Sequence, residues 1–518
     1  MQLLQTRAEL EAWRNGSAER PLHCVPTMGA LHRGHGSLIE RAGRAAPGDA
    51  KPLVLTSVFV NPLQFGPNED FARYPRSLET DLQLAKAAGA DALFAPSVEE
   101  IYPEGEHELT RIQPPPSLQE GLCGRHRPGH FDGVATVVVR LLALIRPQVL
   151  LLGEKDWQQL VILRRVIRDL ALPVQVWGCP TLRESDGLAM SSRNRYLSSD
   201  ERRQAAVLPQ ALLQAATRCL QQPGLDLAPV QADVHQALES AGMVVDYVEA
   251  VKPLCLQAQP RLSGLTVLAV AAHCGPSRLI DHVFLMSRAP IVAIDGPAGA
   301  GKSTVTRAFA ERLGLIYLDT GAMHRAVTWL VRDRAVDPSK AEEVAPLLAD
   351  LDLQLSSTSS GQRVSVNGVD VTDAIRSPEV TAQVSVVAAH GCVREALTQQ
   401  QQAMGARGGL VAEGRDIGTA VFPDAELKVF LTATVSERAR RRALDLEERG
   451  FEVPERADLE AQIAERDHLD STRAVAPLTQ AEDALELITD GLAIDAVIQR
   501  LVDLFRERVP HDAWPDPN

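Results

Sequence analysis

The stretch Gly296-Pro-Ala-Gly299-Ala-Gly301-Lys302-Ser303-Thr304 decides the fold of the second half of the chain. It follows an apolar run, Ile291–Ile294, that is typical of a buried strand. Its glycines let backbone N–H groups turn toward phosphate oxygens, and its lysine adds a cation for the β- and γ-phosphates. We therefore predict a strand, a phosphate-binding loop and a helix whose N-terminus faces an anion. The predicted ATP contacts are Gly296, Gly299, Gly301, Lys302, Ser303 and Thr304; Lys302 is also predicted to be catalytic, and Ser303 to bind Mg²⁺.

A small antiparallel insert is predicted further along this half. The runs Leu351–Ser356 and Arg363–Val366 are followed by Asn367-Gly368, and both residues of an Asn-Gly pair tolerate positive φ. The other elements expected here are strands at Leu410–Ala412 and Lys428–Leu431 and a charged helix at Ser436–Arg449. Together with the phosphate-binding loop, they predict an α/β block.

The first half also alternates strands and helices, which predicts a parallel sheet covered on both faces. The expected strands are Leu22–Val25, Leu53–Val60, Ala92–Ala95, Val149–Leu152 and Val174–Trp177. From about Ser185 the pattern is mostly helical and then β-like at Val244–Val248 and Leu265–Ala271, which predicts a smaller α+β unit. We interpret Asp281–Pro290 as a junction between the halves.

Composition limits the classes of protein that the chain can form. It has 518 residues, 45% of them hydrophobic and 23% charged, which is ordinary for globular domains and allows roughly three or four of them. The net charge of −14 argues against a broad basic surface for nucleic acid. Seven scattered cysteines without a Cys-x-x-Cys pair argue against a disulfide framework or a structural zinc. The N-terminus has no apolar leader and the longest apolar stretch is interrupted by charges, so we expect a cytoplasmic protein without a membrane span.

A pair of histidines marks a second candidate nucleotide site. His32 and His35 lie in the segment Pro26-Thr-Met28-Gly29-Ala-Leu-His32-Arg-Gly34-His35, which follows a predicted strand. Being three residues apart, they share one face of a helix's first turn, where imidazoles and free backbone N–H groups suit a polyphosphate. The spacing alone equally allows a metal site, or a histidine whose hydrogen bonds are satisfied in the core.

Three further segments favour the phosphate interpretation. Gly153-Glu154-Lys155-Asp156 follows a predicted strand, where the ligand loops of α/β sheets lie. Asp186–Arg195 is a basic loop rich in hydroxyl groups, and Phe59–Phe65 ends another strand with amide side chains. These segments strengthen the prediction of a polyphosphate site in the first half.

Four segments of the second half carry a resemblance to a known family. They are Tyr317–Arg325, Val393–Leu397, Glu413–Gly418 and Glu465–Arg473. With the phosphate-binding loop, they closely resemble the bacterial cytidylate kinase family over about residues 291 to 509. The resemblance implies a P-loop nucleoside monophosphate kinase fold that transfers a phosphoryl group from ATP to CMP or dCMP.

The resemblance also implies roles for individual residues. It assigns CMP binding to Thr320, Arg325, Arg394, Arg415, Asp416, Asp470 and Arg473. Arginine forks suit a phosphate dianion, which agrees with that assignment. It assigns Arg438, Arg441 and Arg442 to a lid over ATP, with a solvated surface ion pair as the alternative for each. His324 stands where the family commonly has tyrosine, which puts the nucleotide preference or affinity in question.

The first half resembles a different family. The segments around the two histidines, together with Arg127-Pro-Gly-His130-Phe131, closely resemble pantothenate synthetase over about residues 1 to 282. The resemblance implies an HxGH-type, Rossmann-like nucleotidyl transferase domain and a ligation in two steps. Pantoate attacks the α-phosphorus of ATP, giving pantoyl adenylate and pyrophosphate. The amine of β-alanine then displaces AMP and gives pantothenate.

By this resemblance, His32, His35 and Lys155 are catalytic, because they supply positive charge to the reacting phosphates. His35 matches the position that the family uses as a proton donor. The implied ATP site comprises Met28, Gly29, His32, Gly34, His35, Gly153, Glu154, Lys155, Asp156, Leu182, Met190, Ser191, Ser192 and Arg193. The implied pantoate and β-alanine site comprises Asn61, Gln64, Gln159, Arg127 and His130. For Arg127 and His130, a purely structural loop is the alternative.

The two resemblances together predict a bifunctional α/β enzyme. The expected domains are a Rossmann-like ATP- and pantoate-binding domain (1–184), a small α+β domain (185–282), a junction (283–290) and a P-loop cytidylate kinase domain (291–518). Mg²⁺ is expected with ATP at both sites, with no other cofactor. The expected partners are ATP, pantoate, β-alanine and CMP or dCMP, and a second copy of the chain bound through the synthetase half. Neither nucleic acid nor a membrane is expected.

Three other interpretations compete with this one. The HxGH resemblance would also fit a ligase like an aminoacyl-tRNA synthetase, which the acidic composition disfavours because RNA binding needs cations. UMP or AMP is an alternative acceptor for the kinase half. That half is alternatively a degenerate ATP-binding module, for which His324 is the only support.

Overall fold

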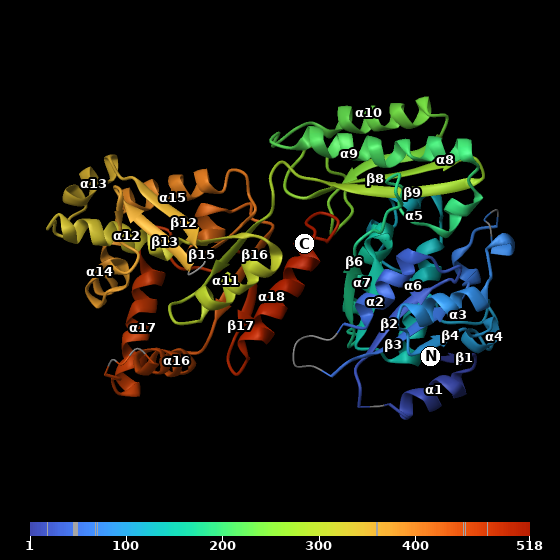
Figure 1. Cartoon of the computed structure of the whole chain (residues 1–518), viewed down its shortest axis with the longest axis horizontal. Helices are drawn as coiled ribbons and strands as arrows, with labels where there is room; N and C mark the ends of the chain where they lie inside the picture. The colour runs from blue at the N-terminus through green and yellow to red at the C-terminus, as the bar shows by residue number, and fades with distance from the viewer. Residues whose placement is uncertain are drawn as a thin grey trace. The chain divides into compact units, whose positions relative to one another are not determined.

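The computed structural model describes residues 1–17, 19–44, 50–67, 69, 71–358, 361–448, 450, 452–473 and 475–517, and Figure 1 shows their course. They form two compact units. The first comprises Met1–Ser287 together with Pro510–Pro515, and the second comprises Arg288–Val509 together with Asp516–Asn518. The six residues 510–515 therefore lie with the first unit, whereas the sequence analysis assigned all of 291–518 to the kinase domain.

The larger part of the first unit is a six-stranded parallel sheet flanked by helices (Figure 1). The strands are β1 (Gln2–Leu4), β2 (Leu22–Thr27), β3 (Leu53–Val58), β4 (Ala92–Phe94), β5 (Val149–Gly153) and β6 (Gln175–Cys179), in the order β1-β4-β3-β2-β5-β6. The helices are α1 (Arg7–Asn15), α2 (Arg33–Ala42), α3 (Leu78–Ala87), α4 (Val98–Ile101), α5 (Leu122–His126), α6 (His130–Ile145) and α7 (Trp157–Asp169). The strand order reverses between β2 and β5, which pair directly. The crevice at such a reversal is where open α/β sheets bind ligands.

The five predicted strands of this sheet are confirmed, but β1 is an addition. It pairs with β4 through Gln2–Ala92, Leu3–Leu93 and Leu4–Phe94. Three residues are too few to show an alternating pattern in sequence, which is why only the tertiary pairing reveals this strand.

The smaller part of the first unit is the predicted α+β unit. It contains α8 (Ser199–Ala205), α9 (Val207–Cys219), α10 (Leu227–Ser240) and the antiparallel strands β7 (Val244–Val251), β8 (Thr266–Cys274) and β9 (Ser277–Leu285). The helices bury Leu208 and Leu212 against Leu268 and Val270 of β8. The predicted start of the junction was wrong, because β9 continues to Leu285. Two buried polar residues, Asp281 and His282, interrupt the apolar pattern of that strand.

The second unit is built on a five-stranded parallel sheet. Its strands are β10 (Ile291–Asp295), β11 (Ile316–Asp319), β15 (Leu410–Gly414), β16 (Leu427–Thr432) and β17 (Leu485–Ile488), in the order β11-β15-β10-β16-β17. Its helices are α11 (Lys302–Leu313), α12 (Thr320–Asp333), α13 (Ala341–Ala349), α14 (Pro378–Ala389), α15 (Gly391–Met404), α16 (Val435–Glu448), α17 (Arg456–Thr472) and α18 (Ile494–Arg508). The predicted charged helix is α16, and its expected last residue, Arg449, lies outside the described residues.

The predicted insert is a three-stranded antiparallel sheet of β12 (Leu353–Thr358), β13 (Gly361–Val366) and β14 (Val369–Asp370). The Asn367-Gly368 turn joins β13 to β14, with φ of 49° and 80°. The antiparallel prediction is therefore confirmed, and the turn residues take the positive φ that the pair tolerates.

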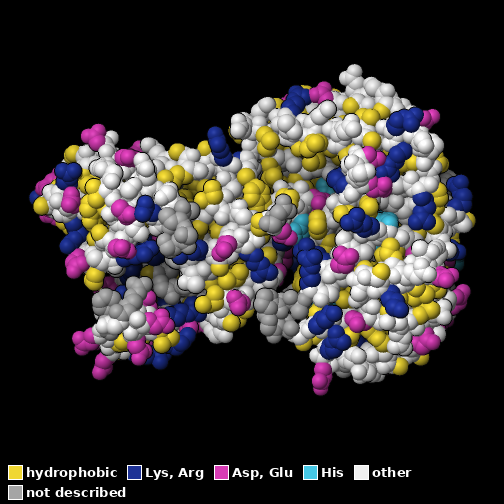
Figure 2. Space-filling view, viewed as in Figure 1, with side chains coloured by type: hydrophobic (Ala, Val, Ile, Leu, Met, Phe, Trp, Pro, Cys, Tyr) yellow, Lys and Arg dark blue, Asp and Glu magenta, His cyan; other side chains and the backbone are white. Residues whose placement is uncertain are grey.

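The surface carries charges of both signs. On the face shown in Figure 2, Lys and Arg side chains are interspersed with Asp and Glu. Within the described part of the chain, no helix is both long and apolar enough to cross a membrane.

Candidate active sites

The phosphate-binding loop of the second unit has the predicted geometry. It runs from β10 into α11, and Gly301 caps that helix with a φ of 86°. Gly296 has a φ of 146°, and a Cβ there would come within 2.0 Å of the Leu431 carbonyl oxygen. Only glycine fits such a position, because the backbone of β16 occupies the space that a side chain would need. The N-terminus of α11 thus presents free backbone N–H groups to the loop.

Lys302 and Ser303 lie at the start of this helix. The Lys302 Nζ donates to the carbonyl oxygens of Gly296 and Pro297, each at 2.8 Å. Burial, and next the positive charge of Arg415, holds the pKa of Lys302 well below its usual range. The Ser303 hydroxyl donates to Glu413 Oε1 at 2.6 Å, so serine and carboxylate oxygens meet beside the loop. Oxygen donors of this kind are those that Mg²⁺ prefers.

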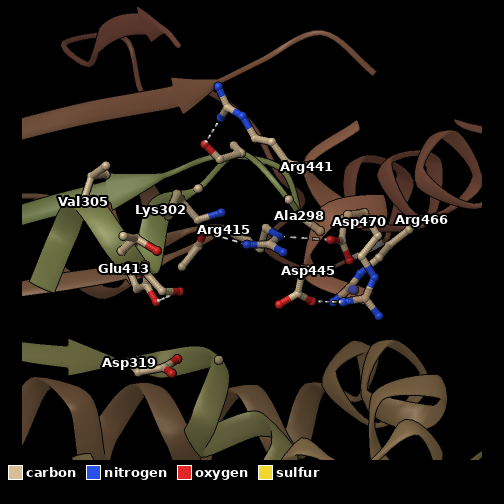
Figure 3. A pocket seen from close by; sticks show the side chains of 18 of the residues that line it. Ala298, Lys302, Val305, Asp319, Glu413, Arg415, Arg441, Asp445, Arg466 and Asp470 are labelled. Carbon is tan, nitrogen blue, oxygen red and sulfur yellow. Dashed lines mark hydrogen bonds and ion pairs between the residues drawn. The ribbon is translucent and has the colours of Figure 1, made fainter. Parts of the chain in front are cut away.

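A cavity of about 770 Å³ opens beside the phosphate-binding loop. Figure 3 shows Lys302 and Arg415 in this space, between Glu413 and Asp470. It is lined by all seven residues predicted to bind CMP and by Gly299, Gly301, Lys302, Ser303 and Thr304 of the loop. One cavity therefore brings together the predicted donor and acceptor sites, and its volume suits nucleotide-sized ligands.

The arginines of the cavity are held in place by carboxylates. Arg415 Nε donates to Asp470 at 3.1 Å and Arg325 to Asp319 at 3.1 Å. Asp416 pairs with Arg394 and lies 3.5 Å from a nitrogen of Arg473. The Arg394 and Asp416 side chains are almost fully buried. Fixed guanidinium groups of this kind can bind phosphate without ordering long, flexible side chains first.

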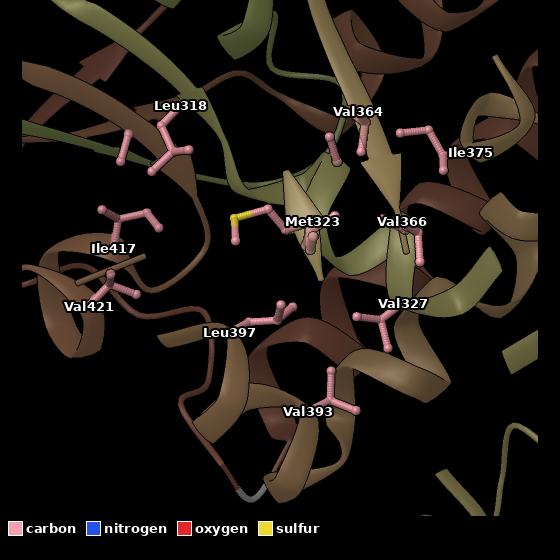
Figure 4. Packing of buried hydrophobic residues seen from close by; sticks show 14 of the residues in the cluster. Leu318, Met323, Val327, Val364, Val366, Ile375, Val393, Leu397, Ile417 and Val421 are labelled. Atoms are coloured by element: carbon pink, nitrogen blue, oxygen red, sulfur yellow. The ribbon is translucent and has the colours of Figure 1, made fainter. Parts of the chain in front are cut away.

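Helix α12 is fixed behind the cavity by the apolar core shown in Figure 4. Met323 and Val327 belong to the same buried cluster as Val364 and Val366 of the insert. Thr320, on the first turn of this helix, donates its hydroxyl to the Glu413 carbonyl oxygen at 2.6 Å. Core packing thus sets the positions of Thr320 and Arg325, while the polar face of the helix lines the cavity.

Arg466 is a cavity residue that the sequence analysis quoted in a motif but did not assign. It lies on α17 one turn before Asp470 and lines the cavity. Burial, and next the charge of Arg415, lowers its pKa. A signal existed in the sequence, because Arg466 and Asp470 are four residues apart and share a helix face.

The three predicted lid arginines differ from one another. Arg438 is only 4% exposed, pairs with Asp467 and does not line the cavity, so it braces the loop through a 3.2 Å bond to the Ala298 carbonyl oxygen. Arg441 lines the cavity and donates to the Ala300 carbonyl oxygen at 3.1 Å. Arg442 lines the cavity as an exposed side chain that pairs with Asp445.

His324 lies on α12 and lines the same cavity. Burial, followed by the charges of Arg394 and Arg473, lowers its pKa to about 3, so the ring is neutral near pH 7. Its Nδ1 is buried without a hydrogen-bond partner among the described residues. The ring therefore adds no charge to the arginines that surround it.

Replacing His324 by tyrosine is expected to lower the KM for CMP by roughly two- to tenfold, the worth of one added hydrogen bond from the phenol to the monophosphate. Steady-state kinetics with CMP as the varied substrate measures this. His468→Tyr, at an exposed position of α17, is the matched control. An unchanged or raised KM for His324→Tyr would place the ring away from the monophosphate.

In the first unit, His32 and His35 form a capping box at the start of α2. The Nδ1 of His32 accepts the Gly34 N–H at 3.2 Å, and the Nδ1 of His35 accepts the His32 N–H at 3.3 Å. Because each Nδ1 accepts, each neutral ring carries its proton on Nε2. The ring centroids are 4.1 Å apart. The pair therefore offers two N–H donors beside a helix N-terminus.

Both histidines are neutral near pH 7, so the positive charge that the sequence analysis expected from them is absent in the free protein. Burial, followed by the charges of His32 and Lys155, lowers the pKa of His35 to about 3. Burial, followed by Lys155 and Arg195, lowers the pKa of His32 to about 4. In the described chain, no three His, Cys, Asp or Glu side chains converge as metal ligands. The arrangement suits hydrogen-bond donation to phosphate oxygens.

The predicted ATP residues of this unit come from three neighbouring places. They lie between β2 and α2 (Met28, Gly29, His32, Gly34, His35), at the carboxyl end of β5 (Gly153, Glu154, Lys155, Asp156) and after β6 (Leu182, Met190, Ser191, Ser192, Arg193). The last two groups meet at a cavity of about 270 Å³, lined by Lys155, Asp156, Gln159, Ser191 and Arg193 among others. A Cβ on Gly34 would come 3.5 Å from Met190 Cβ, so the third segment also packs against the histidine loop.

Glu154 differs from the other residues predicted to bind ATP. It does not line the cavity, and its side chain is buried against residues 510–515 of the same unit. Its two carboxylate oxygens accept the backbone N–H groups of His511 and Asp512, at 3.0 and 2.8 Å. A carboxylate that accepts two N–H groups is not oriented toward nucleotide phosphates.

Asn61, Gln64, Arg127 and His130, four of the five residues predicted to bind pantoate and β-alanine, form one hydrogen-bonded group. Asn61 donates to Gln64 Oε1 at 3.1 Å, and His130 Nδ1 donates to the Gln64 carbonyl oxygen at 2.7 Å. Arg127 donates to His130 Nε2 at 3.0 Å and to Glu69 at 2.6 Å. Arg127 and His130 line the cavity together with Gln159. Asn61 and Gln64 do not line it, and their side-chain amides bond to neighbouring protein groups.

Two parallel sheets, each with a phosphate-binding helix N-terminus at its carboxyl edge, define a bifunctional ATP-dependent enzyme. The family model of pantoate–β-alanine ligases matches residues 2–284, and that of cytidylate kinases matches residues 292–507. The chain therefore belongs to the family of bifunctional pantoate ligase/cytidylate kinases.

Individual relatives agree with this assignment. A bifunctional pantoate ligase/cytidylate kinase of Parasynechococcus marenigrum (strain WH8102) is 63% identical and covers 99% of this chain and 100% of its own. One of Synechococcus sp. (strain CC9605) is 65% identical and covers 95% of this chain and 100% of its own. The crystal structure of pantothenate synthetase from Thermus thermophilus is 46% identical, with a TM-score of 0.50, and covers 55% of this chain and 99% of its own.

Proposed function

We propose that the first unit joins pantoate to β-alanine at the expense of ATP and that the second phosphorylates CMP or dCMP. The observation that supports this most directly is the pair of separate sites, one at the His32–His35 helix terminus and one at the Lys302 loop. Each holds the donors for a nucleotide polyphosphate, and the second adjoins a cavity lined by Arg325, Arg394 and Arg473.

In the ligase reaction, a pantoate carboxylate oxygen attacks the α-phosphorus of ATP, and the bond to pyrophosphate breaks. The Nε2–H groups of His32 and His35 and the ammonium of Lys155 stabilise the negative charge that develops on the phosphates. The amine of β-alanine then attacks the acyl carbon, AMP leaves with the bonding electron pair, and the amine loses a proton. Gln64 and Gln159 orient pantoate, and Asp156 binds the ribose.

In the kinase reaction, a phosphate oxygen of CMP attacks the γ-phosphorus of ATP, and the bond to ADP breaks. Lys302 and the loop N–H groups hold the ATP phosphates. Arg325, Arg394 and Arg473 hold the CMP phosphate, and Asp416 accepts from the sugar. The reaction needs positioning and charge neutralisation and no covalent intermediate on the protein.

Mg²⁺ is proposed to accompany ATP at both sites. In the kinase site, Ser303 Oγ and the neighbouring Glu413 carboxylate fit such an ion, because both are hard oxygen donors. The ion would neutralise charge on the phosphates. In the ligase site, the phosphates themselves would carry it.

A homodimer through the first unit and a cytoplasmic location are also proposed. The support for the dimer is the resemblance of this unit to pantothenate synthetases. The support for the location is the set of scattered cysteines, which suits a reducing compartment. Light scattering on the purified full chain gives the mass, and cell fractionation gives the location.

A paired assay on the full chain tests both activities. One reaction contains Mg²⁺-ATP, pantoate and β-alanine and is followed by AMP release. The other contains Mg²⁺-ATP and CMP and is followed by ADP and CDP, with UMP and AMP as alternative acceptors. Product in both is expected. AMP release without CDP would instead support a degenerate kinase unit, and AMP release stimulated by tRNA would support a ligase of the tRNA-charging kind.

A further inference from the structure

A segment near the C-terminus, Pro510–Pro515, docks into the ligase unit beside its nucleotide site. Pro510–Pro515 belong to the first unit, although the helix that precedes them, α18, belongs to the second. The segment lies outside both family matches, which end at residues 284 and 507. It folds as a tight turn, in which Ala513 and Trp514 donate their N–H groups to the Pro510 carbonyl oxygen at 3.1 and 3.0 Å.

Three segments of the ligase unit hold this turn. Glu154, after β5, accepts the N–H groups of His511 and Asp512. Thr181, after β6, donates its N–H to Asp512 at 2.9 Å and its hydroxyl to the same carboxylate. Arg41, in the last turn of α2, lies 2.8 Å from His511 Nε2. His511 is 4% exposed, so the turn is inserted into the unit and does not merely lie on its surface.

The Glu154 side chain is buried against a glycine of the neighbouring strand. It is 1% exposed, and a Cβ on Gly178 of β6 would come within 2.9 Å of its Oε1. The glycine therefore leaves room for the carboxylate against β6. A buried carboxylate is costly unless its oxygens accept hydrogen bonds, and the docked turn supplies two N–H donors.

Glu154 connects the turn to the nucleotide site. It is the first residue of a single 3-10 turn, Glu154–Asp156, that leads from β5 into α7. The next residue, Lys155, lines the ligase cavity and lies near His32 and His35. Because the turn is only three residues long, the direction of the Lys155 side chain depends on where Glu154 is fixed.

We infer that Pro510–Pro515 is a positioning element of the ligase: by holding Glu154 and Thr181, it fixes Lys155 for the ATP phosphates. The inference rests on the proposed ligase activity. It gives a segment that follows the last helix of the kinase unit, α18, a role in the ligase site. Asp512 is its main side-chain contact, and Glu154 acts through Lys155.

Asp512→Ala in the full chain tests the inference. Losing a charged acceptor for Thr181 is expected to raise the ligase KM for ATP by roughly tenfold. The KM for β-alanine, the kinase constants and the melting temperature are expected to stay the same. Asp512→Asn, which keeps an acceptor oxygen, should restore most of the ATP affinity. Asp516→Ala is the matched control. It also removes one aspartate charge near Asp512, but Asp516 belongs to the second unit and pairs there with Arg506.

A double-mutant cycle with Thr181→Val completes the test. If Asp512 acts through Thr181, the effects of the two changes on the KM for ATP are not additive. An Asp512→Ala chain with an unchanged KM for ATP would overturn the inference, and so would one that loses only apparent kcat along with its melting temperature. If the unsubstituted chain has no ligase activity, the proposed function fails instead, which the same assay shows.

Discussion

Lys302→Ala is expected to lower CMP-dependent ADP formation by roughly 10²–10³-fold, by analogy with the loss of one preorganised donor, and to leave pantothenate formation unchanged. The lysine lies at the start of α11, where its ammonium bonds to two loop carbonyl oxygens within the Gly296–Gly301 turn. In the proposed ATP complex, this ammonium would lie beside the β- and γ-phosphates and stabilise the charge that shifts to them in the transition state.

The size of the effect follows from the burial of this cation. Burial and the nearby positive charge of Arg415 both disfavour the charged form of Lys302. A negatively charged polyphosphate would therefore stabilise its ammonium strongly. Alanine keeps the helix, since it has the highest helix propensity, and removes the ammonium together with its two bonds to loop carbonyl oxygens. Initial rates of ADP and CDP formation with saturating CMP measure the loss.

Two comparisons make the Lys302 result interpretable. Lys340→Ala removes an exposed lysine that pairs with Glu343 at a helix start of the same unit, and it should retain full kinase activity. Pantothenate formation by the Lys302→Ala chain reports that the first unit is still folded. Loss of both activities in a folded Lys302→Ala chain would contradict the existence of two independent sites.

Motifs with fixed spacing were predicted best from the sequence. The Lys302 loop and its helix could be assigned residue by residue, because glycines, lysine and hydroxyl each have a local role that does not depend on distant residues. All seven residues predicted for CMP line one cavity, although their specific roles stay predictions. Arg466 was missed although it shares a helix face with Asp470, because the sequence does not show that this face of α17 lines the cavity.

Contacts between residues distant in sequence could not be predicted. Glu154 stood in the predicted ATP list because of its neighbours Gly153 and Lys155, yet its oxygens accept N–H groups from residues more than 350 positions later. Strand β9 was not predicted, because it contains two polar residues, Asp281 and His282, that are buried in the structure. Asp281 is paired with Arg183. Sequence periodicity reveals an element only when the buried face is apolar.

His35→Ala is expected to lower pantothenate formation by roughly 10²–10³-fold and to leave the kinase unchanged. The ring accepts the His32 N–H at Nδ1, so its proton is on Nε2 and is available to a phosphate oxygen. Alanine removes that donor and also leaves the His32 N–H without its acceptor. The AMP release rate with saturating ATP, pantoate and β-alanine measures the loss.

Side-chain shape separates the two roles of His35. A glutamine at this position can place an amide N–H near the former Nε2 donor, so His35→Gln is expected to retain more activity than His35→Ala. His235→Ala, at a half-buried position of α10 beside Glu239, is the matched control for loss of an imidazole. Equal losses in the Gln and Ala variants would show that the Nε2 donor is not what the reaction uses.

The protonation state of His35 adds a test that does not depend on substitution. Burial and neighbouring cations hold its pKa at about 3, below the ordinary histidine value of 6.5. The free enzyme therefore keeps a neutral ring throughout pH 6–9, and the ring charges only as the pH falls through about 3. We expect kcat/KM for ATP to show no His35-dependent inflection near pH 6.5, since that parameter reports the free enzyme. An inflection near pH 6.5 that disappears in His35→Gln would mean that the proton is transferred from a charged imidazole and not donated as a hydrogen bond.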